Sequence, residues 1–258
     1  MVGTTLQEPT VRASVSQTMS SPSLAPARVI IPSRDWPFYA GMSVVISLLV
    51  FAGFARTYYL KIYTSGSPLS PLVHLHGILF TSWILLFVLQ TMLVAGHRVN
   101  THRRLGLATL PLAAAMIVVG VLTSITGLRL GHNAVGAPDP VAFLAVPLGD
   151  MVIFAILIAF GVYYRQRKEA HKRLMLLATL SLLTAPLGRL PIVGGLPPAV
   201  ALVYAALVLA GPIYDRIAYG RFNRVYLAGA MALWVSVPVR LAIGATQVWH
   251  DFAAWLIS

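Results

Sequence analysis

Residues 72–95 have the sequence LVHLHGILFTSWILLFVLQTMLVA, which contains no Asp, Glu, Lys or Arg. A helix that crosses the hydrocarbon core of a bilayer needs about 20 apolar residues, so this stretch predicts a transmembrane helix. Six other stretches approach the same length and character. The seven predicted spans are residues 38–59, 72–95, 105–126, 141–164, 174–190, 199–214 and 225–247.

The composition of the whole chain agrees with this interpretation. Of 258 residues, 58% are hydrophobic and 10% are charged, whereas soluble chains carry about 25% charged residues. A soluble globular protein is therefore excluded. The chain has no Cys, which rules out disulfides, Cys-ligated zinc, iron–sulfur clusters and thiol catalysis. The predicted fold class is an all-α polytopic membrane helix bundle, with a seven-helix transmembrane domain at residues 37–258.

Residues 1–36 are rich in Ser, Thr and Pro and lack an apolar run of signal-peptide length. Such a composition cannot bury enough apolar surface to fold alone, so we predict a disordered tail. If this tail is cytoplasmic, 14 of the 19 Lys and Arg residues lie on the inner side. Basic residues collect in cytoplasmic loops, so we expect the N-terminus inside and Ser258 outside a bacterial inner membrane. The net charge of +12 is then explained by anionic lipid headgroups at the cytoplasmic face, and nucleic acid is not needed as a partner.

Two features concern the arrangement of the spans. The fifth and sixth are short and contain Pro186 and Pro212, so they could be tilted or partly interfacial. A weak internal repeat relates HRRLGLATL at residues 102–110 to HKRLMLLATL at residues 171–180. The repeat implies two helical hairpins in the same orientation, with a duplication as the plausible origin.

The second span carries a stripe of polar and aromatic residues. His76, Phe80, Trp83, Phe87 and Gln90 follow the spacing of a single helix face. Polar groups at membrane depth turn inward to find partners, so we expect this face to contact other helices. One interpretation is interhelical hydrogen bonding and packing. The other is cofactor binding. In that case His76 is either the metal ligand, axial to haem iron, or a residue in contact with a quinone.

His102 and His171 each begin a predicted helix at the cytoplasmic face, and two basic residues follow each of them. The first interpretation is an interfacial anchor that touches lipid phosphates. The alternative is a matched pair of cofactor-binding sites for an anionic group such as haem propionates, because helix N-termini favour anions.

Asp150 is a carboxylate within an apolar stretch, near the predicted outer end of the fourth span. A charge at that depth needs a partner, and Arg189 and Arg240 are expected in the same leaflet. We therefore predict a polar cluster of Asp150, Arg189 and Arg240, either as a structural ion pair or as a proton or substrate relay near His76.

The segments HLHG (74–77), HRRLG (102–106) and HKRLM (171–175), with Trp83 and Gln90, resemble a family of uncharacterised bacterial inner-membrane proteins with HxHG and HRxLG helix starts. The similarity covers residues 58–190 and implies a bacterial polytopic protein of unassigned activity. The His spacing is also remotely similar to di-haem membrane cytochromes of the b561 type, which implies haem b as a cofactor. Those cytochromes use four His inside adjacent spans, whereas His102 and His171 lie at helix ends.

Two functions remain open at this point. The first is b-type haem or quinone-linked electron transfer. The second is a small-molecule transporter or a non-enzymatic structural membrane component. A transporter should contain a broken helix near a midplane site, and the sequence places such breaks only in the fifth and sixth spans. Substrate and oligomeric state are not indicated by any motif.

Overall fold

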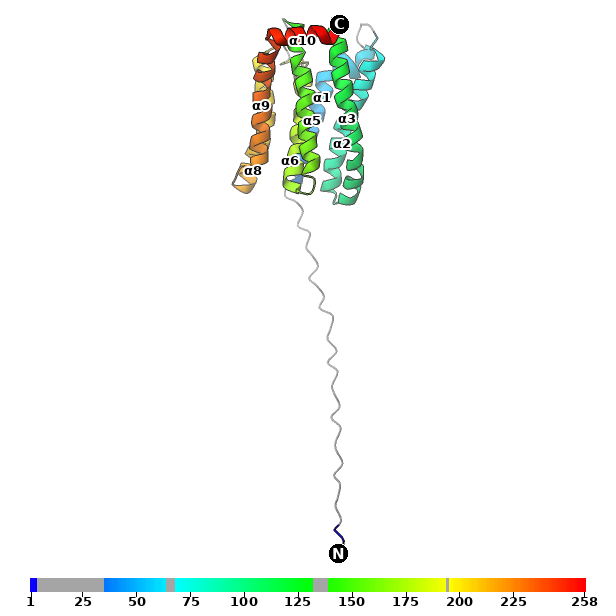
Figure 1. Ribbon diagram of the computed structural model, residues 1–258, viewed down its shortest axis with the longest axis vertical. Helices are drawn as coiled ribbons and strands as arrows, with labels where there is room; N and C mark the ends of the chain where they lie inside the picture. The colour runs from blue at the N-terminus through cyan, green and yellow to red at the C-terminus, as the bar shows by residue number, and fades with distance from the viewer. Residues whose placement is uncertain (4–34, 64–67, 132–138, 194) are drawn as a thin grey trace. The chain divides into compact units, whose positions relative to one another are not determined.

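The computed structural model describes residues 1–3, 35–63, 68–131, 139–193 and 195–258. All regular structure in these residues is helical, which confirms the all-α class. The predicted tail at residues 1–36 lies almost entirely outside the described residues. Figure 1 shows the helical unit, whose elements are α1 (Trp36–Phe54), η1 (Ala55–Tyr59), η2 (Lys61–Tyr63), α2 (Pro71–Ala95), α3 (Val99–Arg129), α4 (Pro140–Phe143), α5 (Ala145–Tyr163), α6 (Lys168–Leu180), α7 (Thr184–Leu187), α8 (Pro197–Tyr219), α9 (Arg224–Gly244) and α10 (Gln247–Ile257).

Within the described ranges, six helical segments are long and apolar enough to cross a membrane, which makes the chain a polytopic membrane protein. They are Trp36–Tyr59, Pro71–Ala95, Val99–Arg129, Pro140–Tyr163, Pro197–Tyr219 and Arg224–Gly244. Each coincides with a predicted span. The sixth predicted span is longer than expected, because α8 continues through Pro212 to Tyr219.

The fifth predicted span, residues 174–190, is the exception. Its helix α6 starts earlier, at Lys168, and ends at Leu180, and a turn at residues 181–183 separates it from the single turn of α7. Pro186 explains the break, because proline has no N–H for the carbonyl four residues before it and its ring clashes there. The broken segment nevertheless runs along most of α1. Lys172 pairs with Asp35 at the start of α1, and Pro186 touches Gly53 at its end.

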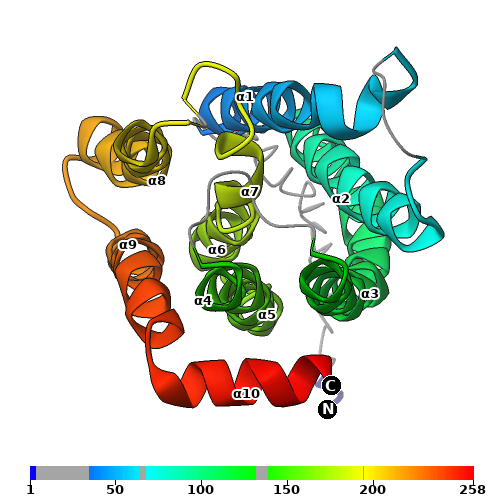
Figure 2. The same cartoon turned by 90° about the horizontal axis from the view of Figure 1, so that it is seen from above.

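Figure 2 shows α5 and α6 in the middle of the bundle, with α2 and α3 on one side and α8 and α9 on the other. The core is shared by α1, α2, α3, α5, α6, α8 and α9. Its largest fully buried side chains are Trp83, Tyr226, Phe154, Ile46, Met116, Leu176 and Leu177. Most other apolar side chains on these helices face outward, as expected for a surface in contact with lipid. The core therefore sits at the centre of the bundle.

Helix α10 was not predicted. The seventh predicted span extended to Gln247, but α9 ends at Gly244 and a new helix begins after Thr246, whose hydroxyl accepts from the Trp249 backbone N–H at 3.2 Å. Figure 2 shows α10 lying across the end of the bundle, from α9 toward α3. Two hydrogen bonds hold it there. The Trp249 indole N–H donates to the Val141 carbonyl (2.8 Å), and Arg129 donates to the Leu256 carbonyl (3.0 Å).

Candidate functional site

His102 of α3 and His171 of α6 lie next to each other, at the end of the bundle where both helices begin. Each is the fourth residue of its helix, so the repeated sequence places them equivalently. The centroids of the two rings lie 6.3 Å apart, and the ring planes meet at 80°. The structure thus brings together two residues that lie 69 positions apart in the sequence.

Both imidazoles are held through Nδ1. Nδ1 of His171 lies 2.8 Å from the carbonyl oxygen of Gly161 in α5. Nδ1 of His102 lies 2.6 Å from the side-chain amide of Gln90 in α2, which donates to it when the amide nitrogen faces the ring. Within the described part of the chain, neither ring uses Nε2 in a hydrogen bond. The pair is thus oriented by two further helices, α5 and α2.

The stripe on α2 does face other helices, but its residues contact different parts of the bundle. The Trp83 indole is 2% exposed, donates to the Thr179 hydroxyl of α6 at 3.3 Å, and packs edge to face on Phe154. The His76 ring stacks on Phe80 of its own helix, with centroids 4.0 Å apart, and its buried Nδ1 has no hydrogen-bond partner among the described residues. Fourteen residues of helix separate His76 from Gln90, a rise of about 21 Å. His76 and the His102–His171 pair therefore lie near opposite ends of the bundle.

Asp150 and Arg240 form a buried ion pair between α5 and α9. The Thr184 hydroxyl of α7 donates to the other Asp150 oxygen at 2.7 Å, and Arg240 also donates to the Val146 carbonyl at 2.9 Å. The chain packs closely here, because a Cβ added at Gly149 would lie 2.0 Å from the Arg240 side chain. The pair thus ties α5, α7 and α9 together within the membrane-length part of the bundle.

Arg189 does not join this cluster. Its guanidinium donates to the Ala185 carbonyl at 2.9 Å and lies over the Phe54 ring, 5.1 Å from the ring centroid. Of the two arginines that the sequence offered to Asp150, the structure pairs only Arg240.

A second buried ion pair, Arg173 with Asp215, was missed by sequence reasoning. Arg173 donates from Nε to Oδ2 (2.9 Å) and from Nη2 to Oδ1 (2.7 Å) of Asp215, and both side chains are nearly inaccessible. Arg173 also donates to the Glu169 carboxylate at 2.6 Å and lies over the Tyr226 ring. This bidentate arrangement joins α6, α8 and α9 at the same end of the bundle as His171.

Asp35 extends this network to the start of α1. Its carboxylate pairs with Lys172 and accepts from the hydroxyls of Tyr219 and Tyr214, the latter at 3.1 Å. Burial alone would raise the pKa of Asp35, but the hydrogen bond from Lys172 and the bond from Tyr219 outweigh it, so this pKa lies below its usual value. The pKa of Glu169 is lowered in the same way, since bonds from Arg173 and Lys172 outweigh the effect of burial.

One signal could have revealed this network. The chain has only seven acidic residues, and Asp215 directly follows the predicted sixth span, where it is costly unless paired. Lys172 and Arg173, the partners of Asp35 and Asp215, belong to a stretch of sequence that is typical of a basic cytoplasmic loop, and this resemblance conceals their role in the network.

No described residues form a cluster of three or more His, Asp or Glu side chains that could hold a metal ion.

No protein-family model, curated protein or solved structure matches the chain.

Proposed function

We propose that the chain is an integral protein of a bacterial inner membrane that crosses the bilayer seven times, with its N-terminus in the cytoplasm. The broken segment α6–α7 supplies the crossing beyond the six long helices, because it contacts α1 near both of its ends. In this topology most Lys and Arg residues of the chain would lie beside anionic headgroups at the inner face.

The topology can be tested on a background free of Cys. We expect a membrane-impermeant maleimide to label an Ile257→Cys variant in intact cells and to leave a Lys168→Cys variant unlabelled until the cells are permeabilised. The opposite pattern would invert the topology. Labelling of both positions in intact cells would refute it, because the proposed topology has an odd number of crossings between them.

We infer that His102 and His171 would hold one b-type haem, which would make the protein a membrane electron carrier. The observation that carries this inference is the proximity of the two imidazoles, whose ring centroids lie 6.3 Å apart. Because a metal–imidazole bond is about 2 Å long, this separation leaves room for one iron held by both rings. The bound iron would supply one-electron redox chemistry.

The contacts around the two rings suit this role. A ligating imidazole normally donates its other N–H to a carbonyl or similar acceptor, and the Gly161 carbonyl occupies that position for His171. For His102, the Gln90 amide nitrogen donates to Nδ1, so binding of iron at Nε2 of His102 would require this amide to turn over and accept from a protonated Nδ1. Gly106, one turn after His102, leaves bare backbone beside the ring, and an added Cβ there would meet only the Gln90 amide at 3.8 Å.

The two basic residues after each His have different roles. Lys172 and Arg173 are engaged by Asp35, Glu169 and Asp215, so they hold α6 in place. Arg103 and Arg104 are exposed beside His102. They are therefore the side chains that could bind haem propionates from this end of the bundle.

The test is an absorption spectrum of the protein purified from cells supplied with a haem precursor. We expect a red preparation whose dithionite-reduced α-band is that of bis-His b-type haem, and loss or displacement of this band in both His102→Ala and His171→Ala. The exposed His97 lies in the turn before α3, so His97→Ala is the matched control and should retain the band. A colourless wild type would exclude haem, and loss of the band only in His76→Ala would move the iron to His76.

A second function, small-molecule transport, is favoured by a different observation. The break between α6 and α7 lies beside the buried Asp150–Arg240 pair, since Thr184 of α7 donates to Asp150. Discontinuous helices beside buried charges form the substrate and ion sites of many transporters. Proton-coupled uptake into proteoliposomes that is abolished by Asp150→Asn, with no haem band, would support transport over electron transfer.

A further inference from the structure

Helix α10 presents three stripes of side chains. Residues that lie three and four positions apart share a face of a helix, and three sets in α10 have this spacing. We name them the bundle stripe, the apolar stripe and the polar stripe. They consist of Trp249, Ala253 and Leu256; of Val248, Phe252 and Trp255; and of Gln247, Asp251 and Ala254, respectively. Because successive residues are turned by about 100°, the apolar stripe lies between the other two.

The bundle stripe fixes the level of α10. Ala253 is fully buried, and the Trp249 indole N–H donates to the Val141 carbonyl at 2.8 Å. At the other end of α10, Arg129 donates to the Leu256 carbonyl at 3.0 Å. Val141 lies at the start of one membrane-length segment, and Arg129 is the last residue of another. Helix α10 is therefore attached where two spans end, and it lies across the long helices rather than along them (Figure 1).

The apolar stripe is exposed. Val248 is 79%, Phe252 is 43% and Trp255 is 69% exposed. The polar stripe is exposed as well, and the Gln247 amide donates to the Asp251 carboxylate at 2.9 Å. Water suits the polar stripe but not three large apolar side chains, because exposed apolar surface costs about 25 cal/mol per Å². The two exposed stripes of α10 thus require different surroundings.

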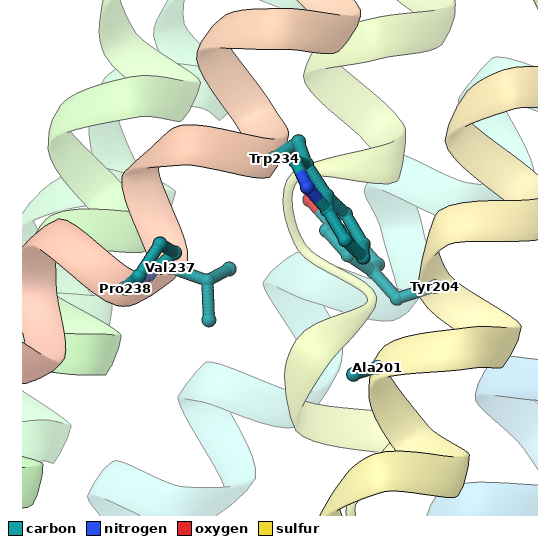
Figure 3. A pocket seen from close by; sticks show the side chains of 5 residues that line it. All are labelled: Ala201, Tyr204, Trp234, Val237 and Pro238. Carbon is teal, nitrogen blue, oxygen red and sulfur yellow. The ribbon is translucent and has the colours of Figure 1, made fainter.

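Two apolar hollows on the spans indicate what surrounds the apolar stripe. One lies between α8 and α9, where the exposed Trp234 belongs to its lining (Figure 3). The other lies between α3 and α5, and Phe252 and Leu256 of α10 line it together with the exposed Val152 and Ile156. Because α3 and α5 belong to segments of membrane-spanning length and composition, we expect their exposed apolar surface to contact lipid. The apolar stripe continues this lipid-facing surface.

We propose that α10 is an interfacial helix, whose apolar stripe inserts into the bilayer at the boundary between lipid headgroups and acyl chains. The polar stripe then faces water. A tryptophan such as Trp255 suits this level, because its ring is apolar and its N–H is polar. Helix α10 contains no Lys or Arg, so burial of apolar surface holds it there, and anionic headgroups are not needed. The proposal requires neither haem nor a particular direction of the chain in the membrane.

Spin labels on single cysteines can test the proposal, because the chain has no Cys of its own. Full-length Val248→Cys and Trp255→Cys variants report on the apolar stripe, and Ala254→Cys is the matched control on the polar stripe. In phosphatidylcholine vesicles, oxygen concentrates in the bilayer and a nickel chelate stays in the water on both sides. We expect labels on the apolar stripe to collide mainly with oxygen, at a depth of about 5–10 Å. The label on the polar stripe should collide mainly with nickel.

A reference position and a change of lipid complete this experiment. Val118 is 58% exposed on α3, so Val118→Cys gives the oxygen and nickel accessibilities expected within the bilayer. Adding phosphatidylglycerol to the vesicles should leave the depth of the apolar stripe unchanged, because α10 has no Lys or Arg to attract it.

A second measurement needs no label. Phospholipids that are brominated near the headgroup end of the acyl chain quench the tryptophans that they contact. Trp255→Phe should lose part of the quenching seen in the wild type, and the rest comes from other exposed tryptophans such as Trp234. Trp83→Phe is the control and should lose none, because the Trp83 indole is 2% exposed.

Three outcomes would overturn the proposal. Predominant collision with nickel on the apolar stripe would show that the stripe faces water. Low access to both oxygen and nickel, with spin–spin broadening, would show that a second copy of the chain covers it. Unchanged quenching in Trp255→Phe would show that lipid does not contact this side chain. None of these outcomes depends on a haem band or on the side of the membrane that α10 occupies, so failure here is distinguishable from failure of the proposed function.

Discussion

The Arg173–Asp215 pair should be one of the main determinants of stability, and Asp215→Asn is the change that tests it. The substitution keeps the size of the side chain and removes its charge. The side chains of Arg173 and Asp215 are 3% and 1% exposed, so water cannot replace the lost partner. Arg173 would retain only one ion pair, with Glu169, whose side chain is 62% exposed.

The expected cost follows from this burial. Removing one member of a buried pair destabilises by about 3–5 kcal/mol, because it leaves an uncompensated charge. The remaining bond to Glu169 places Asp215→Asn at the lower end, about 3 kcal/mol. For a domain of this size each kcal/mol corresponds to roughly 2–4 °C, so we expect the melting temperature to fall by about 6–12 °C.

Thermal unfolding in detergent, followed by Trp fluorescence, measures the effect. Glu169→Gln is the matched control, because it removes a bond to the same Arg173 from an exposed carboxylate and should cost less than about 1 kcal/mol. Replacing both partners, by Arg173→Met with Asp215→Leu, should cost less than the sum of the two single changes. A melting temperature within about 1 °C of wild type for Asp215→Asn, or strict additivity in the double variant, would refute the reasoning.

Three further outcomes are expected. Asp150→Asn should destabilise by about 3 kcal/mol through its unpaired Arg240, and a thermal melt showing that this cost persists unchanged on an Arg240→Met background would contradict the pairing. Because the pKa of Asp35 is lowered in the folded state, the stability that its carboxylate contributes is complete above about pH 4 and is lost as the pH falls through the folded-state pKa. Melting curves should therefore show that the difference in melting temperature between wild type and Asp35→Asn decreases only below that pH. Gly53→Ala should cost roughly 1–3 kcal/mol, because its Cβ would lie 2.3 Å from the Pro186 carbonyl, whereas Gly41→Ala, in open space on the same helix, should not destabilise in the same assay.

The membrane class and most of the helices could be predicted from the sequence because both are local properties. Crossing a bilayer requires a run of apolar residues of a certain length, and each of the six long helices coincides with such a run. Helix ends were less predictable. The start of α6 lies among charged residues at Lys168, and α10 follows α9 so closely that composition does not separate them.

The candidate site shows the same division. The sequence identified His102 and His171 as equivalent helix starts, and it identified Asp150 as a buried carboxylate that needed an arginine. Only the packing of both α3 and α6 against α5 brings the centroids of the two imidazoles within 6.3 Å of each other. Only the packing of α9 against α5 selects Arg240 over Arg189, because the guanidinium of Arg189 lies over Phe54.

The network around Arg173 depended on tertiary structure most of all. In the sequence, Arg173 belongs to a basic segment that fits a cytoplasmic loop, and nothing local distinguishes it from its exposed neighbours. Its burial arises because Asp215 of α8 and Tyr226 of α9 close over the start of α6. A charged side chain is buried in this way only when helices distant in the chain supply both its ion-pair partner and the side chains that shield it from solvent. No local stretch of sequence contains that information.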